Sequence, residues 1–341
     1  MATYEEVESF SSARMGGVGG SDVAAIVGLS PYRRPIDVWE SKVRPEQVPE
    51  LDKECLWFGN ALEPVIRGRY AIRNEIEVVE PSEIGKYFPN SKAWNNQTIV
   101  VGRYPWMLGT ADGWAPALVE GVEIKNIGRK TDEWGEPDTD EIPAMYCVQT
   151  HWYIDIHSAK GWRVAPLFSG NTLGSYRIPR DEQLMKDLRD AVGDFWTSYV
   201  VPKKEPPIDE SENYGKYLAR KFSLSTGNVI KNPSIDLVEW ALKMKHADDE
   251  ESAAADRKRE ANNHLRALVG DAKNAAIKNI GTVGWIRPEE ELVTDWTAVA
   301  SQLSSLYDEA RAADAVTAAE IVAKHTKPKK NEPYLRAWWS R

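Results

Sequence analysis

Two strand-like segments beside a turn, which carry two acids and a lysine, constrain the fold of this chain most. Asp112 stands in Gly-Thr-Ala-Asp-Gly at 109–113, and Glu123 and Lys125 stand in Val-Glu-Ile-Lys at 122–125. Residues two apart on a strand point to the same face of a sheet, so Glu123 and Lys125 share a face while Ile124 points into the core. A hairpin would bring Asp112 next to them. The sequence therefore predicts a hairpin that gathers two carboxylates and an ammonium.

Such a cluster is suited to a hard divalent cation. The carboxylates of Asp112 and Glu123 and the carbonyl oxygen of Ile124 form an oxygen site for Mg²⁺, for which Mn²⁺ can substitute. Such an ion can activate water and offset the charge that develops on a phosphodiester, and Lys125 can assist beside it. Taken alone, however, this spacing favours a simpler interpretation, a hairpin with a solvated salt bridge.

The surrounding periodicity alternates between helix and strand. Helical spacing over 57–72 precedes the acids, and Pro143 suits the first position of a helix over about 144–157. A further helix is expected from Asp181 to about Tyr199. Strand-like segments are found at 76–80, 97–101, 106–110, 120–127, 162–168 and 175–178. The pattern predicts an α/β core, in which a mixed central sheet is flanked by helices.

A cluster of prolines marks the first credible domain boundary. Pro202, Pro206 and Pro207 divide a core over 1–205 from a mainly helical C-terminal extension over 206–341, whose role is unknown. The extension contains a helical region over 235–278, a short strand near 282–287 and a second helix over about 294–323. Its tail, 334–341, alternates aromatic residues with arginine, which suits either single-strand binding or an anchor that packs on the body.

Composition excludes a membrane span and leaves DNA binding open. The chain has no apolar run of 18 residues, and its N-terminus lacks the regions of a signal peptide. Its two cysteines fit a reducing cytoplasm. The net charge is −9, yet residues 201–341 hold 22 basic and 22 acidic residues, so the excess acid lies in the first 200 residues. DNA binding requires a local basic stripe, and carboxylates around a metal bias the total toward acid.

Further polar residues stand at ordered positions around the hairpin. Glu63 lies on the helix before it, Gln149 lies on the helix after it, and Arg14 precedes Ser21 across a glycine-rich loop. Together with Asp112 and the Glu123–Lys125 pair, these stretches resemble the lambda-exonuclease/YqaJ family of viral recombinases, in the PD-(D/E)XK nuclease superfamily. The matching blocks, over about 14–170, are Gly19–Tyr32, Gly59-x-x-Leu62-Glu63-Pro64-x-x-Arg67-x-x-Tyr70, Thr110-x-Asp112-Gly113, Glu123-Ile124-Lys125 and Tyr146-x-x-Gln149.

The resemblance implies a restriction-endonuclease-like core and a role for each matching residue. Asp112, Glu123 and the Ile124 carbonyl would hold the metal, and Glu63 would hold a second metal or its waters. Lys125 would be the catalytic lysine, and Gln149 would support the nucleophile or the scissile phosphate. Arg14 and Ser21 would bind the 5′-terminal phosphate. Simpler interpretations remain open for some of these residues: Glu63 could pair only with Arg67, Gln149 could only bond its neighbours, and Ser21 could only cap a helix.

The same resemblance implies a function. The chain would be a Mg²⁺-dependent 5′-to-3′ exonuclease that acts on ends of linear double-stranded DNA and leaves 3′ overhangs for recombination by strand annealing. A phage single-strand annealing protein would be its partner, and family members can form ring trimers. The setting would be the cytoplasm of a bacterial host, with a phage or prophage gene. Two alternatives stay open: a structure-specific or restriction-like endonuclease, and a non-catalytic DNA-binding recombination scaffold.

Overall fold

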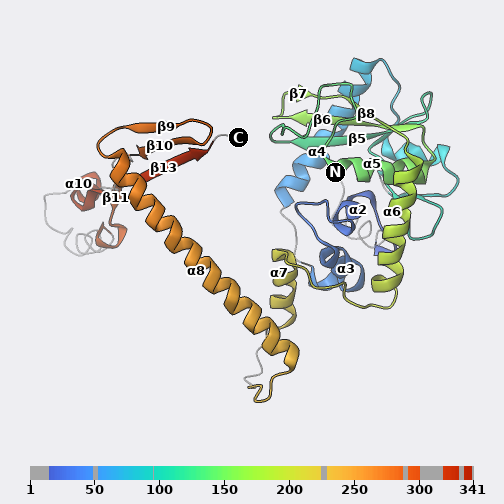
Figure 1. Cartoon of the computed structure of the whole chain (residues 1–341). Coiled ribbons are helices and arrows are strands. Elements are labelled where there is room, and N and C mark those ends of the chain that lie inside the picture. The colour runs from blue at the N-terminus through green and yellow to red at the C-terminus, as the bar shows by residue number, and fades with distance from the viewer. Residues whose placement is uncertain are drawn as a thin grey trace, which may run out of the picture. The chain divides into compact units, whose positions relative to one another are not determined.

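The protein consists of two compact units, Met1–Thr226 and Gly227–Arg341, which we describe separately (Figure 1). The structure is a computed structural model. It describes residues 15–48, 53–94, 96–223, 229–286, 291–299, 318–329 and 334–339. No helix within these ranges is long and apolar enough to cross a membrane.

A mixed sheet forms the centre of the first unit. Strand β5 (Glu120–Ile127) pairs in parallel with β6 (Gly161–Phe168) and antiparallel with β4 (Gly113–Ala115). On its other side β6 pairs antiparallel with β7 (Thr172–Leu173) and β8 (Tyr176–Pro179). This arrangement confirms the predicted mixed central sheet, and it places the Glu-x-Lys strand in the interior of the sheet.

A smaller antiparallel sheet precedes the central one. It contains β1 (Ser91–Trp94), β2 (Gln97–Val101) and β3 (Leu108–Gly109), beside the 3-10 helix η2 (Pro81–Tyr87). The strand expected at 76–80 is absent from this described segment. Within 76–80, Val79 alone makes a bridge, and its partner is Trp114. The backbone amide of each of these two residues donates to the carbonyl of the other. That prediction was therefore wrong.

Two helices cover opposite faces of the central sheet. On β5, Val122 and Ile124 pack against Ile66 and Tyr70 of α4 (Lys53–Asn74). On β6, Trp162 and Val164 belong to the main core together with Trp152 of α5 (Ala144–His157). Because side chains alternate along β5, burial of Val122 and Ile124 toward α4 turns Glu123 and Lys125 toward α5.

The remaining helices of the first unit form a group beside this sheet. Helix α2 (Gly20–Ile26) packs on α5, and α3 (Pro35–Val43) packs on α2. Helix α6 (Glu182–Phe195) follows β8 and continues into the π-helical turn η3 (Trp196–Val200). Its N-cap is Asp181, whose carboxylate accepts from the amides of Gln183 and Leu184, as the sequence indicates.

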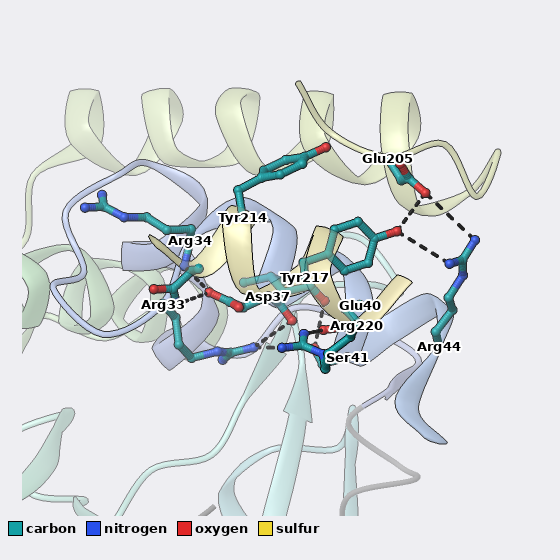
Figure 2. Close-up of polar contacts among 12 residues, drawn as sticks. Arg33, Arg34, Asp37, Glu40, Ser41, Arg44, Glu205, Tyr214, Tyr217 and Arg220 are labelled. Carbon is teal, nitrogen blue, oxygen red and sulfur yellow. Dashed lines mark hydrogen bonds and ion pairs between the residues drawn. The ribbon is translucent and has the colours of Figure 1, made fainter. Parts of the chain in front are cut away.

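Helix α7 (Glu212–Lys221) braces α3 through polar contacts that Figure 2 shows. The guanidinium of Arg220 pairs with Glu40, whose side chain is only 3% exposed. At the other end of α7, the Asn213 amide donates to the Asp37 carboxylate and to the Tyr32 carbonyl. These contacts attach the chain beyond the predicted boundary to the predicted core.

The first unit is therefore longer than the predicted core of 1–205. It extends to Thr226 because Tyr214 and Tyr217 of α7 are buried in one cluster with Trp39 of α3. The prolines at 202, 206 and 207 lie in the connection that leads into α7, so they mark a turn within the unit rather than its end.

The second unit contains the expected long helix and more strand than predicted. Helix α8 spans Ile235–Val269, and a three-stranded sheet follows in the order β13-β10-β9. Strand β10 (Gly281–Ile286) confirms the predicted strand, and β13 (Tyr334–Trp339) pairs with it along its whole length. That pairing favours the anchor interpretation of the tail. The other elements are β9 (Asn274–Ile277), β11 (Glu291–Thr294), α10 (Ala318–His325) and β12 (Thr326–Lys329).

We predict that Arg220→Met destabilises the protein although it changes no apolar core residue. It leaves the buried Glu40 carboxylate without its cationic partner, so we expect the free energy of unfolding to fall by about 2 kcal/mol. Lys216→Met is the matched control, since Lys216 pairs with Glu212 on the exposed side of α7, where a pair contributes about 0.5 kcal/mol or less. Urea denaturation measures the free energy of unfolding of both variants. Equal losses in the two would contradict a stabilising role for the Arg220–Glu40 pair.

Candidate active site

Asp112 lies across from Glu123 on the neighbouring strand, and this pairing is the basis of the site. Gly113 pairs with Val122, so the next residue back, Asp112, lies across from Glu123 at the end of the β4–β5 ladder. The carboxylate Oδ2 of Asp112 accepts a hydrogen bond of 2.7 Å from the backbone amide of Ile124. The predicted hairpin therefore brings the two acids together, and the backbone of β5 fixes the Asp112 side chain.

Glu123 is the most buried acid of the site, with 3% of its side chain exposed. Its Oε1 receives both the Lys125 ammonium and the Gln149 amide, each at 2.6 Å. Its Oε2 is buried and has no hydrogen-bond partner within the described part of the chain. A buried carboxylate oxygen in this state costs free energy, so it favours a cation or a hydrogen-bond donor beside it.

Lys125 supplies the positive charge of the site. Burial opposes its charge, but the carboxylates of Glu123 and Asp112 outweigh burial and raise the pKa of this ammonium above its usual value. Its Nζ also lies 5.2 Å from the centre of the Tyr146 ring, within the range of a cation–π contact. The lysine is therefore held charged and in one place, with 23% of its side chain open to solvent.

Glu63 reaches the same site from α4, and Arg67 connects it to the hairpin. The Arg67 Nη1 donates to Glu63 Oε1 at 3.1 Å and to the carbonyl oxygen of Asp112 at 2.8 Å. Burial raises the pKa of Glu63, Arg67 lowers it, and the negative charge of Glu123 raises it again. Glu63 thus pairs with Arg67, as the simpler interpretation holds, and also lies within electrostatic reach of Glu123.

Sequence reasoning gave no site role to Arg67 or Tyr153. Arg67 is 8% exposed and holds the backbone of the metal-ligand candidate Asp112. The Tyr153 hydroxyl lies 3.5 Å from the Gln149 amide nitrogen and belongs to a residue of the main core. The spacing of Glu63 and Arg67 one helical turn apart signals only their ion pair. Nothing in the sequence signals the contact of Arg67 with Asp112 or distinguishes Tyr153 from other core aromatics.

The electrostatics of the cluster fit a bound cation. Burial raises the pKa of Asp112 well above its usual value, and the charges of Glu123 and Glu63 raise it further. No three His, Cys, Asp or Glu side chains among the described residues lie close enough to enclose an ion by themselves. Mg²⁺ does not require this, because it commonly takes one or two carboxylates and keeps several waters. Asp112, Glu123 and the Ile124 carbonyl, with the unpaired oxygen of Glu123, match that donor set.

The glycine-rich segment lies next to this site. A Cβ added to Gly20 would clash with the Tyr153 ring at 2.5 Å, so this glycine permits the close packing of α2 on α5. The Gly19 amide donates to the Asp22 carboxylate, and that carboxylate also pairs with Arg33 and Lys42.

The structure describes only one of the two residues predicted to bind a 5′-phosphate. Ser21 is exposed at the start of α2, while Arg14 lies outside the described residues. Since the Gly19 amide is already used by Asp22, a phosphate here would depend mainly on side chains.

Comparison with known proteins identifies the region that holds all of these residues. Residues 9–160 match the family described as YqaJ-like viral recombinase domain. This stretch is therefore similar to a YqaJ-like viral recombinase domain. The chain is also 26% identical over 276 residues to the uncharacterized protein YqaJ of Bacillus subtilis (strain 168), across 78% of this chain and 79% of that protein. The resemblance predicted from the sequence motifs is thereby confirmed.

Solved structures similar to the chain include two exonucleases. An alkaline exonuclease (LHK-Exo) from Laribacter hongkongensis matches with a TM-score of 0.43 and 18% identity, over 63% of this chain and 98% of that one. A phage related exonuclease from Haemophilus somnus 129PT matches with a TM-score of 0.38 and 13% identity, over 55% and 95% of the two chains.

We predict that Asp112→Asn stabilises the protein when divalent cations are absent. The change removes a carboxylate that burial, Glu123 and Glu63 all disfavour, so the free energy of unfolding in EDTA should rise on the order of 1 kcal/mol. Added Mg²⁺ should raise the melting temperature of the wild type and have little effect on the variant. Thermal denaturation with and without Mg²⁺ tests both statements, and a variant less stable than wild type in EDTA would contradict them.

Proposed function

We propose that the protein is a Mg²⁺-dependent 5′-to-3′ exonuclease that acts on linear double-stranded DNA and leaves 3′ single-stranded overhangs. The observation that carries the proposal is the convergence of Asp112, Glu123 and Lys125, joined by Gln149, on one side of the central sheet. The match of residues 9–160 to the YqaJ-like viral recombinase family supports recombination as its setting.

Each residue of the cluster contributes a separate effect in this proposal. The ammonium of Lys125 is fixed beside Glu123 and stays charged, so it can stabilise negative charge that develops on a scissile phosphate. Gln149 donates to Glu123 and thereby fixes the orientation of that carboxylate. Arg67 holds the Asp112 backbone in place. These are positioning contacts made before any substrate arrives, which lowers the reorganisation required during reaction.

Mg²⁺ would be held by Asp112, Glu123 and the Ile124 carbonyl, and Glu63 would hold a second ion or its waters. When bound, it would activate water and offset the charge that develops on the phosphodiester. The buried unpaired oxygen of Glu123 and the mutual repulsion of the carboxylates are the features of this chain that support such binding. Mn²⁺ has similar ligand preferences and would substitute.

The proposal includes the setting of the reaction. Ends of double-stranded DNA would be the substrate, and a phage single-strand annealing protein would take up the overhangs. The protein would act in the cytoplasm of a bacterial host, from a phage or prophage gene. A ring trimer, as family members can form, would enclose the duplex and make digestion processive.

We predict that the wild type degrades end-labelled linear duplex in Mg²⁺ and not in EDTA. Asp112→Asn, Glu123→Gln and Lys125→Met should each lower the rate roughly 100-fold or more, because each removes charge from the reacting region. Asp190→Asn is the matched control, since it neutralises an exposed acid of α6 that pairs with Lys186 and should leave the rate unchanged. Gel analysis of strand-specific labels measures both the rate and the polarity.

A covalently closed circular duplex distinguishes the alternatives in the same assay. An exonuclease leaves it intact, whereas cleavage of the circle would assign the site to an endonuclease. Failure to digest any DNA in Mg²⁺ or Mn²⁺, with DNA binding retained, would assign the chain to a recombination scaffold.

We also predict that Ser21 contributes to recognition of a 5′-terminal phosphate. Ser21→Ala should slow digestion of 5′-phosphorylated ends several-fold and leave digestion of 5′-hydroxyl ends nearly unchanged, because one charge-assisted hydrogen bond is lost. Initial rates on the two kinds of end, for wild type and variant, measure the difference. Equal wild-type rates on both ends would remove the 5′-phosphate requirement from the proposal.

A further inference from the structure

Helix α8 of the second unit is far more exposed than a helix of its composition can sustain alone. It spans 35 residues, about 52 Å, and within its own unit only Val269 is buried. Large apolar side chains stand open along it, among them Trp240, which is 67% exposed, and Met244, which is 69% exposed. Most of the stability of a protein helix comes from packing one face against a partner. The described part of the second unit supplies that packing only at the C-terminal end of α8.

The exposed apolar residues of α8 follow a heptad repeat. Spacing of three and four residues, which keeps positions a and d on one seam, runs the whole length of the helix. The seam consists of Leu237, Trp240, Met244, Ala247, Glu251, Ala254, Lys258, Ala261, Leu265 and Leu268. Eight of these ten residues are apolar. A second apolar stripe, Ile235, Val238 and Leu242, ends after two turns, so only the first seam extends over the helix.

Charge is divided unequally between the two halves of α8. The first half, 235–251, holds six acidic and two basic residues, and the second half, 252–269, holds two acidic and four basic residues. Two copies in antiparallel orientation would place the acidic half of each helix against the basic half of the other. Two parallel copies would place like charges side by side, which is unfavourable.

The two charged seam positions select the same orientation. In a parallel pair in register, Glu251 would face Glu251 of the second copy, and Lys258 would face Lys258. In an antiparallel pair centred between residues 252 and 253, Glu251 lies one layer from Lys258 of the other copy. The same register sets Leu237 against Leu268, Trp240 against Leu265 and Met244 against Ala261. Large apolar residues thus meet at both ends, and small ones lie near the middle.

We propose that α8 is a self-association surface through which two copies of this chain pair as an antiparallel coiled coil. The inference is independent of the nuclease activity, because it rests only on the exposure, heptad pattern and charge division of α8. Paired in this way, the two nuclease units would be joined through a long shared helical element.

Sedimentation equilibrium of the full chain tests the proposal. The wild type should show twice the mass of a single chain at micromolar concentration, or six times that mass where ring trimers of the nuclease unit pair through α8. Met244→Glu places a charge in the seam and should weaken association at least about tenfold. Leu242→Glu is the matched control, since Leu242 is similarly exposed, at 60%, but lies off the seam, so association should be unchanged. A single-chain mass for the wild type, or equal effects of the two variants, would overturn the proposal.

A charge exchange tests the orientation and cannot be confused with misfolding. Glu251→Lys alone and Lys258→Glu alone each turn attraction into repulsion in the antiparallel pair, so each should weaken association about tenfold. The double variant restores opposite charges and should return association to the wild-type level. Single variants without effect would overturn the antiparallel arrangement, and so would failure of the double variant to recover.

Discussion

The hydrogen bond from the Ile124 amide to the Asp112 carboxylate is the contact on which the site depends. It joins a loop residue to the backbone of the central strand, and it determines that Asp112 lies across from Glu123 rather than in solvent. Because β5 is paired on both sides, by β4 and β6, that backbone cannot shift without breaking two ladders. The acids are therefore positioned by the sheet, and Lys125 follows from the alternation of side chains along the same strand.

The two faces of β5 explain how one short strand serves both stability and chemistry. Val122 and Ile124 enter an apolar cluster with α4, whereas Glu123 turns toward Gln149 on α5. The apolar side supplies the burial that fixes the strand. The polar side holds the buried carboxylate of Glu123, one oxygen of which has no hydrogen-bond partner among the described residues. A site of this kind is less stable than an apolar alternative, and such local conflicts are expected where function requires them.

Sequence reasoning predicted the parts of the fold that local periodicity determines. The ranges of β5 and α5 and the convergence of Asp112 with the Glu123–Lys125 pair all follow from spacing and turn chemistry. Contacts between distant segments were missed. Arg67 bridges 45 positions to reach Asp112, and α7 packs on α3 across more than 170, so neither leaves a local signal. The domain boundary was misplaced for that reason, since prolines mark a turn but do not reveal what packs beyond it.

Internal cations explain how so acidic a cluster can fold without a metal ion. Lys125 neutralises Glu123 and Arg67 neutralises Glu63, whereas the Asp112 carboxylate accepts a hydrogen bond from the backbone amide of Ile124. Asp112 is thus the acid whose charge is least compensated, which agrees with the strong rise of its pKa through burial and neighbouring carboxylates. A divalent ion would relieve this charge most at Asp112. The position predicted first from the sequence is therefore also the one at which the electrostatic demand for a cation is greatest.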